Sequence, residues 1–524
     1  MKIWIIAGLV VMIHFVLFAQ DWNHSEFELR YLEQSVPMRI DPITVYDVTS
    51  VRITEILFGA LYSTDRSTAR IPEFADGEPR LSEDGMSAVV KLKPDLKFSD
   101  GTPIRVSDII FTWKAATNPK SFSPNRQMYR NIANISALDS STIRVTFRHP
   151  VSDARRYLMF FIVPKSIFLS TEIDRDLTYC REPDPTSGGY RIFNKKGTGQ
   201  EFLFVKNPYY NGKTKPSIEK IRMNVHTDIL GHVDNLRNGL ADLIPFVPPA
   251  KVPVIKQDSR FKIELYDANQ FDFIAFNLEN EFLKFQEIRQ AINMAFNRKE
   301  ILASFFNDDG DLMSGPFPPT HSGFNPDVQP WPYDPNMART MLQNMGFEDS
   351  DGDGILEYNG KPLEFNMLTA LCRDPDYSSV ISSFVEQMRN IGIRINTQEF
   401  LYDAFESKVR KGDFDMVYYT RKVTQEADYS PFFMSDQIGI GGKNIGRYSN
   451  PLVDSLFVMA NSTLDFQKRV ELYKEVHKII HDDCPYVFLW YLKYHAAYIR
   501  ELKNVSIDPY YFFTTIEEWF YMKD

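Results

Sequence analysis

Helix-like and strand-like segments alternate along the whole 524-residue chain, and no low-complexity linker separates them. Residues 288–296 carry apolar side chains at 288, 291, 292 and 295, which is the spacing of an amphipathic helix. Residues 202–205 form a short apolar run that ends at Asn207 and Pro208, which is typical of a strand followed by a turn. A chain of this length exceeds what one hydrophobic core usually supports. The sequence therefore predicts an α/β protein of two or three domains whose boundaries lie within compact structure.

Helix start signals and further periodic segments support this interpretation. Asn297 stands three residues before Glu300, a capping arrangement that predicts a second helix directly after the first. In residues 106–113 we expect Ser107 to cap a helix, with Asp108 near its positive end. The remaining predicted elements are amphipathic helices at 379–391 and 464–480 and a strand at 414–419.

Composition excludes several classes of protein. Lys and Arg total 59 against 69 Asp and Glu, which gives a formal net charge of −10, and no stretch is densely basic. A nucleic-acid-binding protein needs a basic face for phosphate contacts, so we expect no nucleic-acid partner. The mean hydropathy is negative, which excludes a protein with many membrane spans. The hydrophobic fraction of 44% is too high for a disordered chain.

The N-terminal segment is typical of a secretory signal peptide. Lys2 is the only charged residue before Asp21, and residues 3–18 form an apolar run. This run is shorter than the ~20 apolar residues of a membrane span, and Ala19 provides a cleavage site. We therefore expect residues 1–19 to be a signal peptide and the rest of the chain to be periplasmic or otherwise extracytoplasmic. An uncleaved N-terminal anchor is the alternative. No Cys stands at the cleavage point to carry a lipid anchor.

Cysteine and histidine offer little for metal chemistry. Cys180, Cys372 and Cys484 are widely spaced, so two of them could pair in an oxidising compartment, and no C-x-x-C pair exists to bind zinc. His477 and His481 are four residues apart on a predicted helix, as a metal pair would require. We interpret them instead as solvated histidines near a helix C-terminus. The sequence predicts no metal and no cofactor.

The sequence also lacks motifs for catalysis. It contains neither a G-x-S-x-G nucleophile elbow nor an H-E-x-x-H zinc helix. The glycine-rich residues 439–446 lack the spacing of a phosphate-binding loop and are interpreted as a turn. Residues 349–354 alternate carboxylates and glycines like a calcium loop, but position 12 of such a loop would be Gly360 and Glu357 stands at position 9. A polar turn is the preferred interpretation, and a short calcium-binding turn is the alternative.

Six longer strings carry more information than these short motifs. They are FSDGTPIRVSDIIFTW from Phe98, SGGYRIF from Ser187, KNPYYNGKTKPSIEKI from Lys206, LRNGLADL from Leu236, FNLENEFLKFQEIRQAINMAFNRKEIL from Phe276 and GFEDSDGDGILEYNGKPLEF from Gly346. In this order they closely resemble the family-5 extracellular solute-binding proteins, the peptide-binding components of ABC importers. The resemblance runs from about residue 40 to about residue 500.

The resemblance implies two α/β lobes joined by a hinge, with a ligand enclosed between them and a small extra α/β domain on the first lobe. The first lobe would comprise residues 20–50, 185–268 and 488–524, the extra domain 51–184 and the second lobe 269–487. Two crossings of the chain, near residues 268 and 488, would form the hinge. Closure of such lobes is a hinge motion that a ligand biases by binding both faces.

The resemblance also implies a partner for the amino terminus of a peptide. In the family an Asp after a second-lobe strand takes this role, and here Ala427, Asp428 and Tyr429 resemble that motif. We expect Asp428 to bind the ammonium group, and an Asp that caps its own loop is the alternative. The family usually has a Trp just after this strand, whereas Arg421 stands here, followed by another cation. This departure favours a ligand that carries a carboxylate, unless Arg421 is simply exposed.

For the peptide carboxylate, a dipeptide-binding relative would use an Arg shortly before a second-lobe helix, and Arg373 lies in that region. An arginine binds a carboxylate through two parallel N–H bonds. Tyr46, in an early loop expected to face the cleft, would supply a ring or a hydroxyl group, or else belong to the core.

These observations together predict an exported binding protein without catalytic activity. It would be a monomer that captures a short peptide and delivers it to an ABC permease in the membrane. An oligosaccharide-binding protein, or a nickel- or haem-binding protein, of the same fold is the alternative. From other classes, a secreted hydrolase and a cytoplasmic regulator are the alternatives. The hydrolase lacks an evident nucleophile or carboxylate pair, and the signal peptide argues against the regulator.

Overall fold

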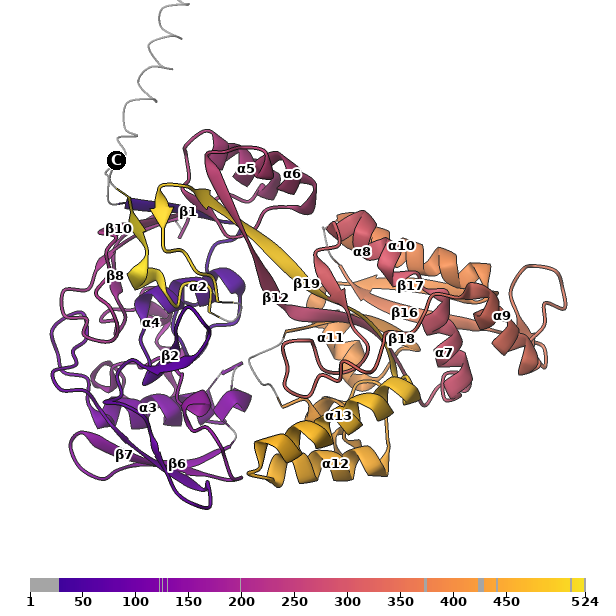
Figure 1. Cartoon of the computed structure of the whole chain (residues 1–524), viewed down its shortest axis with the longest axis horizontal. Helices are drawn as coiled ribbons and strands as arrows, with labels where there is room; N and C mark the ends of the chain where they lie inside the picture. Colours follow the sequence, from indigo (N-terminus) through magenta and orange to yellow (C-terminus); the bar gives the residue numbers. More distant parts are fainter. Residues whose placement is uncertain are drawn as a thin grey trace, which may run out of the picture.

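The protein consists of two lobes that lie side by side and are joined by two long strands, β12 (Phe261–Phe276) and β19 (Tyr486–Ile499) (Figure 1). This computed structural model describes residues 28–522 except 122, 125, 130, 198, 372–374, 423–427, 440–441 and 509–510. The predicted signal peptide, residues 1–19, lies outside the described residues. Within the described part of the chain, no helix combines the length and the apolar character of a bilayer-spanning segment.

One mixed sheet of 11 strands runs through both lobes. Its order is β17 (Arg394–Phe400), β16 (Glu364–Ala370), β18 (Met416–Lys422), β12, β19, β11 (Leu243–Ile244), β1 (Glu28–Glu33), β10 (Lys220–Val225), β9 (Glu201–Lys206) and β8 (Tyr190–Lys196), and β13 (Gly310–Leu312) pairs with β19 beside this path. The two lobes are therefore connected by a continuous hydrogen-bonded sheet.

The pairing of the two crossing strands is interrupted at two adjacent places. β12 and β19 are antiparallel, and their register shifts between Phe271 and Phe273 and also, over a longer interval, between Asp267 and Phe271. Within this interval Asn269 has a left-handed backbone with a φ of 53°, which an asparagine tolerates better than most residues. Such an irregularity bends a strand and increases its local twist. The first predicted crossing, near residue 268, falls in this interval, and the second, near residue 488, lies within β19.

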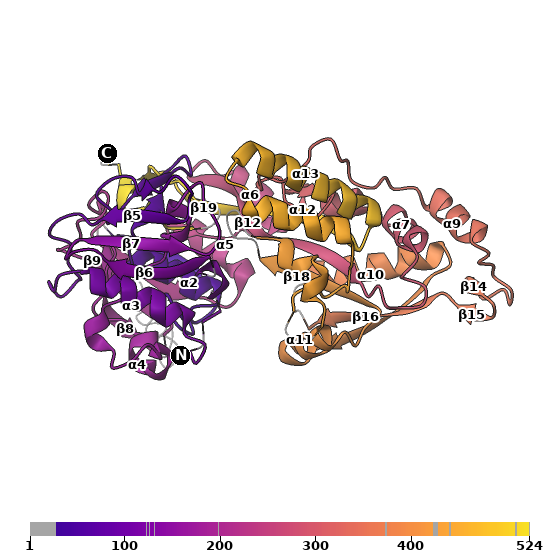
Figure 2. The ribbon, with the colours of Figure 1, turned by 90° about the horizontal axis from the view of Figure 1, so that it is seen from below.

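Helices cover both faces of the second-lobe part of the sheet. One face packs against α7 (Gln286–Ala295), α8 (Arg298–Phe306), α9 (Pro335–Asn344) and α10 (Pro375–Asn390), and the other against α11 (Tyr402–Lys411), α12 (Pro451–Ser462) and α13 (Phe466–Asp483). Figure 2 shows α12 and α13 packed alongside each other. Because both faces are covered, the last six residues of β12, FDFIAF, are all buried.

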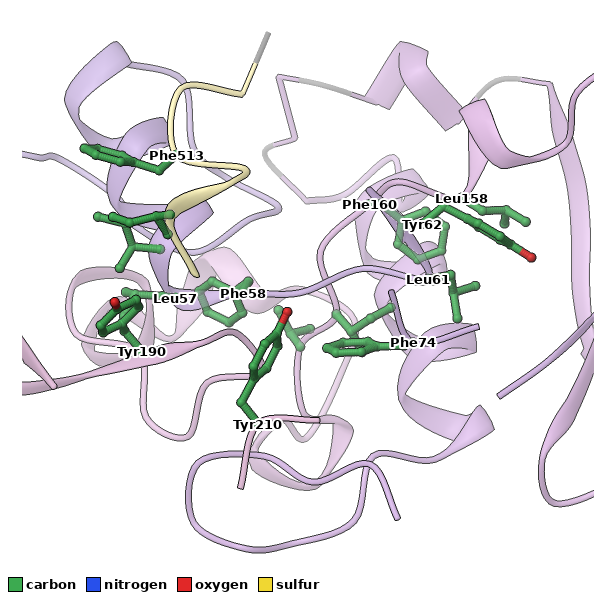
Figure 3. Close-up of a cluster of buried hydrophobic side chains, with 14 of the residues drawn as sticks. Leu57, Phe58, Leu61, Tyr62, Phe74, Leu158, Phe160, Tyr190, Tyr210 and Phe513 are labelled. Atoms are coloured by element: carbon green, nitrogen blue, oxygen red, sulfur yellow. The ribbon is translucent and has the colours of Figure 1, made fainter. Parts of the chain in front are cut away.

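The extra domain has its own sheet but shares the core of the first lobe. Its four antiparallel strands are β4 (Arg80–Leu81), β5 (Ser87–Lys91), β7 (Thr142–Phe147) and β6 (Ile132–Ala137), with α3 (Val106–Thr117) beside them. One cluster of buried side chains extends from Leu29 in β1 through this domain to Trp519. Figure 3 shows the part of this cluster around Phe58, Phe74 and Tyr210.

The remaining elements are short or peripheral. They are α2 (Val48–Leu57), β2 (Tyr62–Thr64), β3 (Arg70–Pro72), α4 (Leu177–Arg181), α5 (Ile229–Arg237), α6 (Val252–Lys256), β14 (Glu357–Tyr358), β15 (Lys361–Pro362), β20 (Leu502–Lys503) and β21 (Phe520–Tyr521). α5 and α6 pack on the first lobe over a small separate cluster that includes Val233 and Ile255.

Most of the predicted elements are confirmed. α7 buries the apolar positions of its predicted face, and the side chain of Asn297 caps α8 by accepting a hydrogen bond from the Glu300 N–H. The predicted cap at Ser107 is wrong, because α3 begins at Val106 and Arg105 precedes it as the N-cap. Asp108 Oδ2 accepts the Arg105 N–H at 2.7 Å. The carboxylate of Asp108, rather than the hydroxyl of Ser107, thus accepts a backbone N–H at the start of α3.

Candidate functional site

The two lobes approach each other at several points. A Cβ atom placed on Gly85, in the turn between β4 and β5, would lie 2.5 Å from Cδ2 of Leu464, between α12 and α13. Partial desolvation lowers the pKa of the surface residue Lys422 at the end of β18, and the carboxylate of Asp47 at the start of α2 opposes this shift. Asp47 and Lys422 come from opposite lobes, so the end of β18 lies close to the first lobe.

Three parallel strand ends gather at one edge of the second lobe. β16 runs parallel to both β17 and β18, so the carboxyl ends of these strands lie at the same edge, which we call the carboxyl edge. In open α/β sheets ligands bind outside the carboxyl ends of the strands. Large side chains are exposed just after two of these strands: Leu371 (52%), Leu401 (71%) and Tyr402 (66%). The carboxyl edge is therefore the candidate ligand site of the second lobe.

Arg421, a sequence-predicted site residue, is the next-to-last residue of β18 and is buried rather than exposed. Its side chain packs among aromatic rings, with the guanidinium carbon 3.4 Å from the centre of the Phe432 ring and 5.3 Å from that of Phe273. Only 8% of the residue is exposed. Burial lowers the pKa of the guanidinium group. A cation thus lies buried at the end of β18, just before the loop that leads to Asp428.

Asp428 and Tyr429 lie on that loop but have different surroundings. Asp428 is exposed, and its Oδ1 accepts hydrogen bonds from the Ser430 N–H at 3.0 Å and the Ser430 hydroxyl at 2.6 Å. This carboxylate therefore caps its own turn. Tyr429 is 2% exposed, and its ring packs against those of Phe317 and His321 with centroid distances of 5.4 and 5.1 Å. Tyr429 thus contributes to a hydrophobic core of the second lobe.

The other two predicted site residues lie elsewhere. Arg373 lies outside the described residues, in the segment between β16 and α10. Tyr46 precedes α2 in the first lobe and is 42% exposed. It stands next to Asp47, whose side chain caps α2 by accepting the Ser50 N–H. The structure therefore places Tyr46 and Asp47 on the first lobe, close to the end of β18.

The prediction of two solvated histidines is wrong. His477 is fully buried, and its Nε2 lies 2.9 Å from the Ser314 hydroxyl. Nδ1 of His481 lies 2.7 Å from the carbonyl oxygen of Ser314. Burial lowers the pKa of His477 to about 3, so its imidazole is neutral. Both rings face Ser314, in the segment that follows β13. Their environment is therefore set by packing within the lobe rather than by solvent.

Cysteine pairing is absent among the described cysteines. Cys180 and Cys484 are both buried free thiols, and Cys372 lies outside the described residues. Burial, as the largest cause, raises the pKa of Cys484 to about 12. These two thiols therefore act as apolar core side chains.

The acidic turn between α9 and β14 brings its carboxylates together. Ligand atoms of Asp349, Asp351, Asp353 and Glu357 lie within 4.8 Å of one another. Several of these oxygens accept hydrogen bonds within the turn, including the Ser350 N–H to Glu357 at 2.8 Å. The segment is thus a polar turn between helix and strand, as predicted, and its carboxylates are arranged as the calcium alternative would require.

A second acidic group, which the sequence interpretation missed, lies inside the first lobe. Glu55, Glu73, Lys213 and Glu517 line a cavity of about 20 Å³. Phe58 and Tyr62, which are labelled in Figure 3, also line it. Glu517 Oε2 makes no hydrogen bond with the described residues and lies 3.8 Å from Lys213 Nζ. The only sequence signal was that these glutamates stand within apolar runs such as ITEILF and TTIEEWF.

Burial dominates the acid–base properties of this cavity. It raises the pKa of Glu55 to about 8 and that of Glu517 to about 7. The Phe513 N–H, which donates to Glu55 Oε2 at 2.8 Å, and the charge of Lys213 only partly oppose these shifts. The two side chains therefore hold protons in the folded protein at a pH at which the unfolded chain has lost them.

Solved structures share this architecture. The structure of the oligopeptide-binding protein AppA from Bacillus subtilis in complex with a nonapeptide superposes with a TM-score of 0.79 at 23% identity, covering 95% of this chain and 99% of that chain. NikZ from Campylobacter jejuni in complex with Ni(L-His) gives a TM-score of 0.78 at 23% identity, covering 94% and 99%. The two-lobed fold is thus that of periplasmic binding proteins.

Sequence comparison identifies the family. The oligopeptide-binding protein AppA of Bacillus subtilis (strain 168) is 26% identical over 489 residues, which cover 91% of this chain and 88% of the relative. The model of the middle region of the bacterial extracellular solute-binding proteins, family 5, matches residues 70–435, which is more than half of the chain. The chain therefore belongs to the bacterial extracellular solute-binding proteins of family 5.

Proposed function

We propose that this protein captures short peptides between its lobes and delivers them to an ABC permease, without catalysing a reaction. The observation that carries the proposal is the carboxyl edge of the second lobe, which lies opposite Tyr46 and Asp47 of the first lobe. A ligand bound at this edge would contact both lobes and so favour their closed arrangement. The oligopeptide-binding protein AppA, which matches nearly the full chain, supports a peptide as the ligand.

The proposal includes the domain boundaries and the maturation of the chain. Residues 1–19 would be removed on export, and residues 20–50, 185–268 and 488–524 would form the first lobe. The extra domain would comprise residues 51–184 and the second lobe 269–487. The irregular pairing between Asp267 and Phe271 supports a hinge at the crossing strands. We expect a monomer.

For the peptide termini, we propose Asp428 as the ammonium partner and Arg373 as a carboxylate partner. Asp428 is exposed, and Ser430 engages only its Oδ1, which leaves Oδ2 for an ammonium group. A buried ammonium–carboxylate pair needs such a charge-assisted hydrogen bond. Tyr46 would contact the ligand from the first lobe. Tyr429 would support the Asp428 loop from below.

Peptides should stabilise the purified protein. Binding to the folded state alone raises the free energy of unfolding by about 2.7 kcal/mol when the ligand concentration is 100 times Kd. We expect trialanine or a longer peptide from a random panel to raise Tm by several degrees in differential scanning fluorimetry. A shift with cello- or manno-oligosaccharides and none with peptides would instead support the oligosaccharide alternative. Hydrolysis of a chromogenic peptide or glycoside would contradict a function without catalysis.

The variant Asp428→Asn should weaken peptide binding by about tenfold, because a charged hydrogen-bond partner becomes neutral. Asparagine keeps an Oδ1 acceptor for Ser430, so the turn and the Tm of the ligand-free protein should be unchanged. Asp436→Asn, at an exposed Asp shortly after the loop, is the matched control. Isothermal titration calorimetry with the peptide found in the panel measures the effect. Equal affinity of wild type and Asp428→Asn would remove Asp428 from the site.

A nickel- or haem-binding function has less support. Nε2 of the buried His477 and Nδ1 of His481 both lie within hydrogen-bond distance of Ser314, and neither histidine belongs to a group of three potential metal ligands among the described residues. Among the described residues, the group of side chains that could hold an ion is the all-carboxylate turn at Asp349. Hard oxygen ligands suit calcium or magnesium rather than nickel.

A further inference from the structure

A buried carboxylate, Asp272, stands at the start of a chain of hydrogen bonds in the crossing strands. The residue is only 3% exposed and lies in β12, where the register with β19 shifts. Two residues of β19, Leu489 and Trp490, stand opposite Asp272 at this bulge, and a bulge of this kind re-aims side chains. The indole N–H of Trp490 donates to Asp272 Oδ2 at 2.9 Å.

The chain of hydrogen bonds continues to the carboxyl edge of the second lobe. The Thr420 hydroxyl of β18 donates to Asp272 Oδ1 at 2.6 Å. The Tyr377 hydroxyl, in the first turn of α10, lies 2.9 Å from the same Thr420 oxygen. Thr420 and Tyr377 are half-buried, and Thr420 stands on the same face of β18 as Lys422, which lies close to the first lobe. The chain thus connects the crossing strands with the candidate ligand site.

The charge of Asp272 determines the direction of these hydrogen bonds. A hydroxyl group has one proton to donate, and an ionised carboxylate only accepts. While Asp272 is ionised, Thr420 donates to it, so Tyr377 must donate to Thr420 and offers only its oxygen lone pairs to other groups. When Asp272 is protonated, Oδ1 carries the proton, because the indole of Trp490 only donates and engages Oδ2. Thr420 then accepts from Asp272 and donates to Tyr377, whose own proton becomes available to another acceptor.

The surroundings of Asp272 place this reversal near neutral pH. Burial raises the pKa of Asp272 to about 6, and the hydrogen bonds from Thr420 and Trp490 only partly oppose this shift. Among the described residues, the titratable groups that face Asp272 are phenols, namely Tyr418 of β18 and, through Thr420, Tyr377 of α10. Burial raises the pKa of Tyr418 well above its ordinary value, so this phenol stays neutral.

We propose that Asp272 is a positioning residue of the ligand site, which orients the Tyr377 hydroxyl so that its oxygen accepts a hydrogen bond from an N–H group of the bound peptide. This inference rests on the proposed function and adds a ligand contact and the residue that controls it. The ionised carboxylate makes the bond from Thr420 charge-assisted and so holds the chain more firmly. The reversed chain presents an O–H donor where the peptide N–H needs an acceptor, which weakens binding.

Peptide affinity at two pH values tests this positioning role. The probe is trialanine or, if a longer peptide of the panel binds more tightly, that peptide. In Asp272→Asn the amide accepts from Trp490 and donates to Thr420, which fixes the reversed direction at every pH. Isothermal titration calorimetry should give this variant a Kd about five- to tenfold above that of the wild type at pH 7.5 and about equal to it at pH 5. Comparison at the same pH cancels the effects of all other titrating groups.

Two tyrosine variants identify the residue that contacts the peptide. Tyr377→Phe removes the proposed acceptor, so its Kd should also exceed that of the wild type at pH 7.5, and this difference should become smaller at pH 5. Tyr358→Phe, at an exposed tyrosine of β14, is the matched control and should bind like the wild type at both pH values. Wild-type affinity of Tyr377→Phe at pH 7.5 would overturn the proposed contact.

Thermal stability separates positioning from a purely structural role. Because the pKa of Asp272 is raised in the folded state, its ionisation above pH 6 destabilises the folded protein. The Tm of ligand-free Asp272→Asn should therefore be about 1–2 °C above that of the wild type at pH 7.5 and equal to it at pH 5. We thus expect a more stable variant that binds peptide less tightly.

The outcomes distinguish this inference from the proposed function. Equal ratios of variant to wild-type Kd at both pH values, or a lower Tm of Asp272→Asn at pH 7.5, would overturn the positioning role and leave peptide binding intact. Binding of no peptide of the panel to the wild type would overturn the peptide-binding function, and the positioning role with it.

Discussion

Replacing Arg30 with methionine should lower the free energy of unfolding by about 3–5 kcal/mol. Arg30 in β1 donates through Nε to Asp242 Oδ2 at 3.0 Å and through Nη2 to Asp242 Oδ1 at 2.7 Å. Its Nη1 also donates to the Gly239 carbonyl oxygen at 2.8 Å. The Asp242 side chain is only 1% exposed, so the single variant leaves a carboxylate buried without its cation.

Denaturant unfolding, followed by circular dichroism, measures this loss. The double variant Arg30→Met/Asp242→Leu is the control, because it removes both charges and leaves none unpaired. We expect it to recover most of the stability that the single variant loses. An unchanged unfolding midpoint for Arg30→Met would show that this buried pair does not stabilise the junction of β1 with the turn before β11.

The contribution of the buried first-lobe glutamates to stability should decrease as the pH rises from about 5 to about 8. An unfolded glutamate ionises near pH 4.5, whereas burial raises the folded-state pKa of Glu55 to about 8 and of Glu517 to about 7. Between these values the folded chain holds protons that the unfolded chain has lost. The stability from these groups is thus complete below pH 4.5 and is lost as the pH rises through the folded pKa. The total effect is on the order of a few kcal/mol.

The variants Glu55→Gln and Glu517→Gln separate this contribution from that of other groups. Each glutamine stays neutral throughout, so Tm of the variant should depend less steeply on pH between 5 and 8.5 than Tm of the wild type. His477 and all other titrating groups are common to the compared proteins, so their effect cancels in the difference. Parallel Tm–pH curves for wild type and both variants would contradict the raised pKa values.

Local signals in the sequence identified much of the secondary structure. The spacing of apolar residues in α7 and the Asn297 cap of α8 depend on neighbouring residues alone, and both were predicted. The cap of α3 was not predicted, because Asp108 also accepts the Lys165 N–H at 2.8 Å, from a segment far along the chain. The burial of His477 likewise depends on the distant Ser314.

The candidate site also depends on contacts between distant residues, which the sequence alone did not predict. Arg421 was predicted as a site residue because the family usually has a Trp just after this strand, whereas this chain has an arginine. That Arg421 is buried and without a hydrogen-bond partner among the described residues could be seen only in the packed structure. The strand order that brings β16, β17 and β18 to one edge also depends on long-range pairing, which residue spacing does not encode.

The path of the chain through the shared sheet has a consequence for the order of folding. The chain leaves the first lobe along β12 and returns along β19, so the second lobe can assemble from one continuous segment. The first lobe cannot, because its sheet needs β19 and its core needs Phe513 and Trp519. Contacts between residues so far apart in sequence form slowly. A nascent chain would therefore keep its first lobe open until nearly all of it has been synthesised. This delay suits a family of proteins that act outside the cytoplasm, because a chain that folds late can cross a membrane before it becomes compact.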